Sequence, residues 1–395
     1  MTAEPRASAS ARAVWWRDPR YRAWIFQALA LVGVVGIGWY LIGNVVENMA
    51  TRGIASGFGF LGTTAGFGII QTLIPYAETS SYFVALVVGF LNTILIAFIG
   101  VILATLLGFT IGIARLSNNW LVRKLATIYI ETFRNIPLLL QIFFWYHAVL
   151  KPLPGPNESV DIFGSFFINN RGMYFPALKS GWGFVGILLT IVVGVAITMV
   201  ISRWAKARQA RSGEQFPVFV VGLGLIVGMP FVVFLILSYI YGYDVPKLEG
   251  FNFTGGIVII PEFVALLLAL SVYTASFIAE IVRAGIQAVS HGQSEAAQAL
   301  GVRPRQTLKL VIIPQAMRVI IPPLTSQYLN LTKNSSLAVA IAYPDLTAVF
   351  AGTVLNQTGQ AVEIIAITMA VYLTISLLTS GFMNWYNAKK ALVER

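Results

Sequence analysis

The sequence predicts an all-α protein that crosses a membrane about eight times. The composition indicates this class, because 57% of the 395 residues are hydrophobic and only 11% are charged, which is too apolar for a soluble domain. Apolar runs of about 20 residues also recur along the chain, and each is long enough to cross a bilayer as a helix. The predicted spans are 24–43, 84–114, 126–150, 183–202, 216–240, 261–283, 319–342 and 361–383.

The segments outside these spans are short. The stretch 54–75 is apolar but contains many glycines, so we interpret it as an external re-entrant or interfacial segment. The first apolar run begins at Trp24 and is too long for the apolar part of a secretory signal, so we expect an uncleaved first span. The longest external stretches are too short or too apolar to form a domain that captures a solute; they are about 44–83, 151–182 and 241–260.

The basic residues orient the predicted spans. Twenty of the 27 Lys and Arg residues fall on one side of this topology, five fall on the other side, and two lie within spans. Because basic loops stay in the cytoplasm, this bias places both termini on the cytoplasmic side. The formal net charge of +11 is therefore explained by topology. We expect a lipid membrane, and not a nucleic acid, as the partner of these charges.

Side chains for catalysis or metal binding are scarce. The chain has no cysteine, and its two histidines, His147 and His291, are too far apart in sequence to suggest a metal cluster. No nucleophile–base pair is evident, so a membrane-embedded enzyme is not supported. The phosphate-binding pattern G-x4-G-K-[ST] is absent. We expect neither an enzyme nor a metal or cofactor site in this chain.

A polar and basic stretch, residues 290–314, lies between two apolar runs on the predicted cytoplasmic side. Ser290 and Gln293 fit a capping box, which predicts the start of a helix. Gly301 fits the left-handed position after a helix end, and Pro304 suits the start of a second helix. The stretch therefore predicts a short helix, a turn and a basic segment.

This short helix has features of a docking element. Glu295 lies in its early part, where a carboxylate complements the helix dipole and offers one directional charged contact. Ala296 and Ala297 leave a flat surface that a partner can approach closely. An ordinary helix within a loop is the alternative interpretation.

The same residues carry a family resemblance. Glu295-Ala296-Ala297, three residues, Gly301, nine residues and then Val311-Ile312-Ile313-Pro314 resembles the EAA loop of bacterial ABC importer permeases, E-A-A-x3-G-x9-I-x-L-P. The chain departs from that pattern only by apolar exchanges at Val311 and Ile313. The resemblance implies that this helix couples the permease to a dimer of ABC ATPases, which bind MgATP.

Further motifs resemble the polar-amino-acid branch of these permeases, and most closely the membrane subunits of general L-amino acid ABC transporters. They are ETFRNIPLLLQ at 131–141, AEIVRAG at 279–285, PQAMR at 314–318 and LTKNSSL at 331–337. The implied fold is a type I importer permease core with additional helices. The predicted organisation is 1–83, N-terminus, first span and external segment; 84–150, first part of the core; 151–260, an insert with two spans; and 261–395, second part of the core with the coupling loop 290–314.

The resemblance implies a function and a set of partners. We expect the membrane subunit of an ATP-driven importer that moves L-amino acids, with broad specificity for polar ones, from periplasm to cytoplasm. Its location would be the bacterial cytoplasmic (inner) membrane. Its partners would be the ATPase dimer, a periplasmic amino-acid-binding protein and a second permease subunit. That subunit could be a copy or a paralogue, and the resemblance suggests a paralogue. The alternative is a self-sufficient, ion-coupled secondary transporter, which would need mid-membrane carboxylates and inverted repeats that the sequence does not display.

Polar residues within the spans are candidates for the translocation path, because charges in a membrane are costly. The run Lys333, Asn334, Ser335 and Ser336 cannot face lipid and must face protein or a water-filled path. One interpretation is that Lys333 pairs with a carboxylate and locks helices together; the other is that the run lines the path and binds a substrate carboxylate. Further candidates are Glu131, Arg134 and Glu280, with Glu131–Arg134 and Glu280–Arg283 each spaced to meet on one helix face.

Small residues at helical spacing predict close helix packing. The spacing occurs at Gly108 and Gly112 in the second span, and at Gly224 and Gly228 in the fifth. The pattern is common in membrane proteins and does not identify a partner.

Overall fold

The computed structural model describes residues 19–51, 53, 56–179 and 183–390. Within these residues, seven helices are long and apolar enough to cross a membrane, and an eighth apolar helix, Leu138–Leu150, is shorter. The long helices are Tyr21–Thr51, Tyr82–Arg115, Val185–Ser212, Val218–Tyr241, Pro261–Gln287, Pro304–Ile341 and Ala361–Ala388. The predicted multi-pass helical fold is confirmed.

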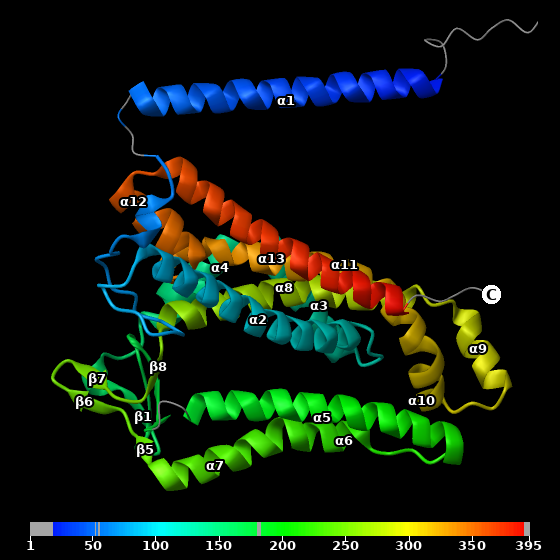
Figure 1. Cartoon of the computed structure of the whole chain (residues 1–395). Helices are drawn as coiled ribbons and strands as arrows, with labels where there is room; N and C mark the ends of the chain where they lie inside the picture. Colours follow the sequence, from blue (N-terminus) through cyan, green and yellow to red (C-terminus); the bar gives the residue numbers. More distant parts are fainter. Residues whose placement is uncertain (1–18, 52, 54–55, 180–182, 391–395) are drawn as a thin grey trace, which may run out of the picture.

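The core is a bundle of α2 (Tyr82–Arg115), α8 (Pro261–Gln287), α11 (Ile313–Asn334) and α13 (Ala361–Lys390) (Figure 1). The closest packing is between α2 and α8, where glycines remove the side chains that would separate the two backbones. A Cβ atom added at Gly112 would lie 2.6 Å from the carbonyl oxygen of Ala279 and 2.8 Å from the Cβ of Val282. The predicted close packing at Gly108 and Gly112 is therefore confirmed.

We expect Gly112→Ala to destabilise the bundle by about 1–3 kcal/mol, because the added methyl group must displace backbone in a packed core. Gly228→Ala is the matched control, since a Cβ atom there meets nothing within 4 Å. Thermal unfolding in detergent measures both variants. Equal melting temperatures for Gly112→Ala and Gly228→Ala would contradict the assigned packing.

The third predicted span, 126–150, is not one continuous helix. The structure has α3 (Trp120–Asn135), a break at Ile136 and Pro137, then α4 (Leu138–Phe143) and the π-helix η3 (Phe144–Leu150). Ile136 is extended, with φ −93° and ψ 127°, as expected for a residue that precedes proline. At 1.5 Å per residue, the 13 residues Leu138–Leu150 reach only about 20 Å, less than the thickness of a bilayer core.

The seventh predicted span, 319–342, also changes conformation before it ends. α11 stops at Asn334 and continues as the 3-10 helix η7 (Ser335–Ile341). Ala342 then adopts a left-handed conformation, with φ 57°, and the chain turns into the π-helix η8 (Thr347–Val354) and α12 (Leu355–Thr358). The sequence analysis placed a loop where η8 and α12 lie.

Hydrogen bonds to α2 and α13 hold this turn. The buried Asn92 donates to the carbonyl oxygen of Pro344 at 2.9 Å, and the hydroxyl of Thr93 accepts from the N–H of Leu346 at 3.0 Å. The fully buried Asp345 accepts from the N–H of Ala348 at 2.8 Å and from the hydroxyl of Tyr372 at 3.2 Å. The turn is therefore fixed by contacts that are distant in the sequence.

The insert 151–260 contains a helical pair and small sheets. α5 (Gly183–Ser212) packs against α6 (Val218–Leu223), η5 (Gly224–Gly228) and α7 (Met229–Tyr241). The predicted close packing at Gly224 and Gly228 is wrong, because a Cβ atom at either position meets nothing within 4 Å. The close approach is at Gly194, where an added Cβ atom would lie 2.5 Å from the carbonyl oxygen of Leu225.

Short strands, which the sequence analysis did not predict, occupy the rest of the insert. One sheet has the order β1-β2-β3-β8 with antiparallel pairs, and two further pairs are β4–β5 and β6–β7. Three residues separate the paired Ile162 and Phe166, and two of them, Phe163 and Gly164, have positive φ, as in tight hairpin turns. The strands are Val160–Ile162, Phe166–Asn169, Gly172–Phe175, Ala177–Leu178, Tyr243–Asp244, Lys247–Glu249, Asn252–Thr254 and Ile257–Ile259.

The N-terminal helix α1 (Pro19–Thr51) stands apart from the bundle in Figure 1, and its most apolar window is not buried against the rest of the chain. The segment that follows is irregular and contains the 3-10 helix η2 (Gly59–Gly62). Phe60 and Ala65 in this segment are buried against the ends of α2 and η8. Of the predicted re-entrant or interfacial stretch 54–75, residues 54 and 55 lie outside the described residues.

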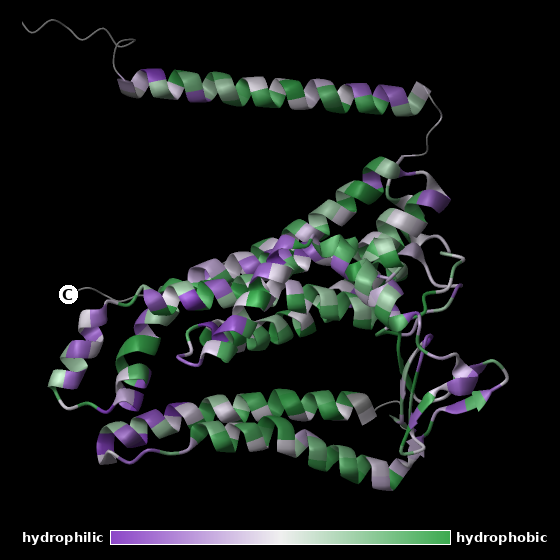
Figure 2. Cartoon of the chain, turned by 180° about the vertical axis from the view of Figure 1, so that it is seen from behind, coloured by the Kyte–Doolittle hydropathy of each residue, from purple (hydrophilic) through white to green (hydrophobic). Residues whose placement is uncertain are grey.

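The two ends of the bundle differ. α9 (His291–Ala299), the turn between α5 and α6 and the last residues of α13 gather at one end, whereas the strands and the segment 56–80 lie at the opposite end (Figure 1). Figure 2 shows hydrophilic residues concentrated at these ends and hydrophobic residues along α5 and α7. The distribution of basic residues predicts that the α9 end is cytoplasmic.

Candidate functional site

The first candidate site is the projecting helix α9. Its C-terminus is closed by two backbone bonds: Gly301 donates to the carbonyl of Gln298 at 2.9 Å, and Val302 donates to the carbonyl of Ala297 at 3.0 Å. Gly301 has φ +71°, as predicted. This pair of bonds is a Schellman motif, which satisfies the final carbonyls and fixes the exit direction. Pro304 then opens α10 (Pro304–Thr307) at its first position, also as predicted.

The start of α9 differs from the prediction. Ser290 is the N-cap residue, but its side chain makes no capping bond. Gln293 does not reach back to it; its side-chain oxygen instead accepts from Gln315 at 3.3 Å. Glu295 lies beyond the first turn, and its carboxylate pairs with His291 Nδ1 at 3.0 Å. Capping hydrogen bonds therefore fix the C-terminal end of α9, whereas its N-terminal end has no side-chain cap.

One face of α9 is free for a partner. Glu295 and Ala296 are exposed, as is Ala299, and Leu300 at the C-cap is 82% exposed. Ala297 is buried, so the predicted flat surface of two adjacent alanines is wrong; α9 itself packs against η6 (Leu308–Ile312) and α10. Leu300 was missed by the sequence analysis, although a leucine just before a C-terminal glycine on a polar helix is a readable signal. This face combines a carboxylate, small side chains and one exposed apolar side chain.

The second candidate site is a face that runs along the end of α11 and η7. Side chains three apart overlap in a 3-10 helix, so every third residue shares one face. Ser335, Ala338 and Ile341 are buried on one such face. A neighbouring row of η7 is more open, with Val339 49% exposed and Ser336 half-buried. The flanking residues Lys333, in the last turn of α11, and Ala342, just after η7, are exposed. We call this the open face, and define it as Lys333, Ser336, Val339 and Ala342.

The structure separates the four polar residues predicted together at 333–336. Lys333 lies on the open face and forms no ion pair with any described residue, so it does not lock helices through a carboxylate there. Ser336 lies on the same face and donates to the carbonyl of Lys333 at 2.7 Å. Asn334 is half-buried. Ser335 is fully buried and donates to the carbonyl of Thr332 at 2.7 Å, so it does not reach the open face.

The predicted acidic residues belong to an ion-pair cluster toward the α9 end. Arg115 at the end of α2 pairs with Glu280 of α8 at 2.5 Å and with Glu131 of α3 at 3.3 Å. Glu280 also pairs with Arg283, as predicted. Glu131 and Arg134 do not pair, because Arg134 lies in the last turn of α3 with its guanidinium 5.2 Å from the ring centroid of Phe277. The cluster joins three helices; a role of these residues in the path stays a prediction.

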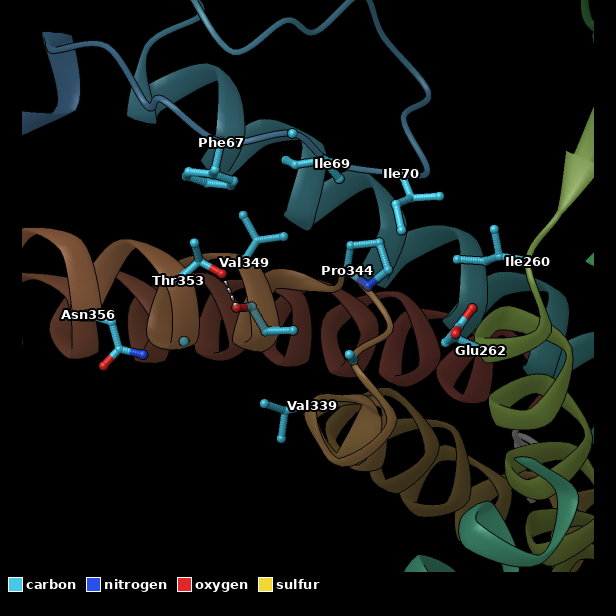
Figure 3. Close-up of a pocket in the computed structure, with 14 residues that line it drawn as sticks. Phe67, Ile69, Ile70, Ile260, Glu262, Val339, Pro344, Val349, Thr353 and Asn356 are labelled. Atoms are coloured by element: carbon cyan, nitrogen blue, oxygen red, sulfur yellow. Dashed lines mark hydrogen bonds between the residues drawn. The ribbon is translucent and has the colours of Figure 1, made fainter. Parts of the chain in front are cut away.

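A cavity of about 410 Å³ lies where η7 and η8 meet the start of α8 and the segment 56–80. We call it the Glu262 pocket. Among the residues that line it are Ile70, Ile260, Glu262, Val339 and Asn356. Figure 3 shows Glu262 and Asn356 apart in the cavity with Val339 between them. Val339 and Ala342 belong both to this pocket and to the open face. The sequence analysis missed Glu262, because a carboxylate in the first turn of a helix is ordinary.

No group of three or more Asp, Glu or His residues suited to a metal ion occurs in the part of the chain that the structure describes. The bundle of long apolar helices indicates a multi-pass membrane protein.

Comparisons with known proteins identify the family. Residues 216–391 match the family described as binding-protein-dependent transport system inner membrane component. YhdX of Escherichia coli strain K12, described as an amino-acid ABC transporter permease, is 55% identical over 378 residues, which cover 96% of each chain. AapQ of Rhizobium johnstonii, a general L-amino acid transport system permease, is 54% identical over 378 residues, 96% of this chain and 94% of AapQ. BztB of Rhodobacter capsulatus, a glutamate/glutamine/aspartate/asparagine transport system permease, is 43% identical over 414 residues, 96% of each chain.

These likenesses extend over nearly the whole chain. The chain belongs to the amino-acid ABC transporter permeases of the binding-protein-dependent transport family, with the type I importer fold. The resemblance inferred from the EAA loop and the accompanying motifs is thereby confirmed.

Proposed function

We propose that this chain is the membrane subunit of an importer that moves L-amino acids from the external side to the cytoplasm, driven by ATP hydrolysis in a separate ATPase dimer. The observation that carries the transport route is the open face, because it presents a lysine and a serine that pair with no carboxylate among the described residues. A charge in this position is costly in lipid and becomes tolerable beside a water-filled path. A second permease subunit would supply the other wall of that path.

The coupling to ATP is assigned to α9. Its rigid C-terminal cap and its exposed face suit a helix that seats in a groove of a partner and moves as one body with it. MgATP would bind only in the ATPase, so this chain would hold no cofactor and would not itself be an enzyme. An external amino-acid-binding protein would deliver the solute at the strand end of the molecule. The protein would reside in the bacterial cytoplasmic membrane with both termini in the cytoplasm.

The substrate range is proposed from the relatives. AapQ is named for general L-amino acid transport, and BztB is named for glutamate, glutamine, aspartate and asparagine. We propose a broad range of polar L-amino acids for this chain as well.

The test is purification from the native membrane in a mild detergent, identification of the partners, and reconstitution into proteoliposomes. We expect an ATPase and a second permease subunit to copurify. Uptake of L-glutamine should require ATP on the ATPase side together with the binding protein, and should persist when ionophores collapse ion gradients. Uptake by the chain alone, driven by an ion gradient, would overturn the proposal in favour of a secondary transporter.

A further inference from the structure

The Glu262 pocket has the form of a small-molecule site. Its volume of about 410 Å³ lies in the range of ligand pockets and exceeds that of one amino acid. Its walls are largely apolar, with Phe67, Ile70 and Val339 among them. Figure 3 shows these side chains arranged around the cavity with the carboxylate of Glu262 at one end. Such apolar walls reduce screening by water and strengthen any charge that faces the cavity.

Among the described residues that line the pocket, Glu262 is the one with a charged side chain. The buried hydroxyl of Tyr146 donates to its Oε1 at 2.7 Å, which fixes the orientation of the carboxylate. Its other oxygen, Oε2, accepts no hydrogen bond from the described residues. One carboxylate oxygen is therefore held in place, while the second is left for a donor from outside the described residues.

We propose that the Glu262 pocket binds the ammonium group of an amino acid as it enters the transport path. The proposal rests on the proposed import of L-amino acids and deepens it by assigning the first contact within the membrane subunit. An ammonium group carries three N–H donors and a full positive charge, which complements a carboxylate with a free oxygen. The apolar walls would hold the carbon atoms of the solute.

The pocket also leads toward the open face. Val339 and Ala342 belong to both, and Ser336 and Lys333 follow at intervals of three residues. At about 2.0 Å per residue, the seven residues of η7 that lie between Ala342 and Lys333 cover roughly 14 Å. A zwitterionic solute would thus meet a carboxylate first and a lysine further along. These opposite charges favour amino acids over solutes that carry a single charge.

A purely structural role is the alternative for Glu262, since it lies in the first turn of α8, where a carboxylate stabilises the helix. The two roles predict different behaviour of transport and of ATP hydrolysis. A structural defect would impair assembly and lower both activities together. A binding defect would lower uptake while the loaded binding protein still stimulates hydrolysis.

The experiment measures uptake of radiolabelled L-glutamine by the whole complex in proteoliposomes, at saturating loaded binding protein, beside ATP hydrolysis. We expect Glu262→Gln to reduce uptake at least tenfold and to leave the stimulated hydrolysis within twofold of the wild-type rate. Gly352→Leu provides an independent variant, because Gly352 lines the pocket and a Cβ atom there meets only the carbonyl oxygen of Thr347 at 3.6 Å. Its side chain should fill the cavity without disturbing the fold and give the same result.

Glu78→Gln is the matched control, because Glu78 is an exposed carboxylate of the segment 56–80 that does not line the pocket. Uptake within twofold of wild type in Glu262→Gln or in Gly352→Leu would overturn the proposal. An equal fall of uptake and hydrolysis in Glu262→Gln would also overturn it, since that result indicates a structural role. Absence of ATP-dependent uptake in the wild-type complex would sink the proposed function itself, which is a separate outcome.

Discussion

Replacing Glu295 with lysine is expected to detach the ATPase from this permease and to abolish ATP-driven uptake. The carboxylate is 69% exposed and its only described partner is His291, which is itself 88% exposed. The substitution therefore removes only an exposed pair, and the stability of the chain should change little. It reverses the one charge on the exposed face of α9, so a complementary contact becomes a repulsive one. We expect at least a tenfold loss of affinity for the ATPase, equivalent to about 1.4 kcal/mol or more.

Leu300→Asp should have a similar effect for a different reason. Leu300 is 82% exposed in the isolated chain, and full burial of a leucine against a partner contributes about 1.5–3 kcal/mol. An aspartate at this position would lose that contribution and would carry a charge into the interface. Copurification of the ATPase with the permease, measured beside ATP hydrolysis, checks both variants.

The control for both changes is Glu214→Lys. Glu214 is also an exposed carboxylate with one described partner, Arg208 at 2.5 Å, and it belongs to the turn between α5 and α6. That turn lies at the same end of the bundle as α9 but on different helices (Figure 1). If Glu295→Lys and Leu300→Asp retain the ATPase as well as Glu214→Lys does, α9 is not the docking helix.

The long helices could be predicted because hydropathy over some 20 residues is a local property of the sequence. α2, α8 and α13 contain the predicted spans 84–114, 261–283 and 361–383 almost unchanged. The break in the third span also had a local signal that was not used. Pro137 cannot continue a helix from Ile136 without losing a backbone bond, and it forces the preceding residue into an extended conformation.

The break after α11 had no such signal. Pro322 and Pro323 lie inside that helix, whereas the chain turns twenty residues later at Ala342. The turn is held by Asn92 and Thr93, about 250 residues earlier in the sequence. Contacts of this separation cannot be inferred from local patterns, so the sequence analysis extended the helix and assigned a loop to η8.

The sequence predicted where α9 begins its C-terminal cap, but not which way the side chains of α9 and of the run 333–336 point, and it did not predict the Glu262 pocket. The caps at Gly301 and Pro304 are local, and the structure agrees with them. The direction of Ala297 depends on how α9 packs against η6, and the direction of Ser335 depends on a change from 3.6 to 3.0 residues per turn. Without knowing the helix type, the sequence could not separate the exposed Lys333 from the buried Ser335 within the run 333–336.

Lys333→Met is expected to reduce amino-acid uptake by about 10- to 100-fold while ATP hydrolysis continues. A charge-assisted hydrogen bond to a substrate carboxylate is worth about 1.5–3 kcal/mol, which corresponds to that range of rates. Methionine keeps an apolar stem of similar length but removes the ammonium group. Lys333 forms no ion pair with any described residue. Removing its charge therefore leaves no described carboxylate unpaired. Stability should therefore change little, and Lys333→Arg should retain part of the uptake because it retains the charge.

The variant also separates the two interpretations of this lysine. If Lys333 locks this chain to a carboxylate of the second permease subunit, its loss should weaken copurification of that subunit and lower ATP hydrolysis and uptake in parallel. If it lines the path, the complex should remain intact and only uptake should fall. Lys247→Met is the control, because it makes the same side-chain change on the exposed strand β6, far along the chain from the open face. It should alter neither uptake nor ATP hydrolysis. Unchanged uptake in an intact Lys333→Met complex would remove this lysine, and with it the open face as defined here, from the transport path.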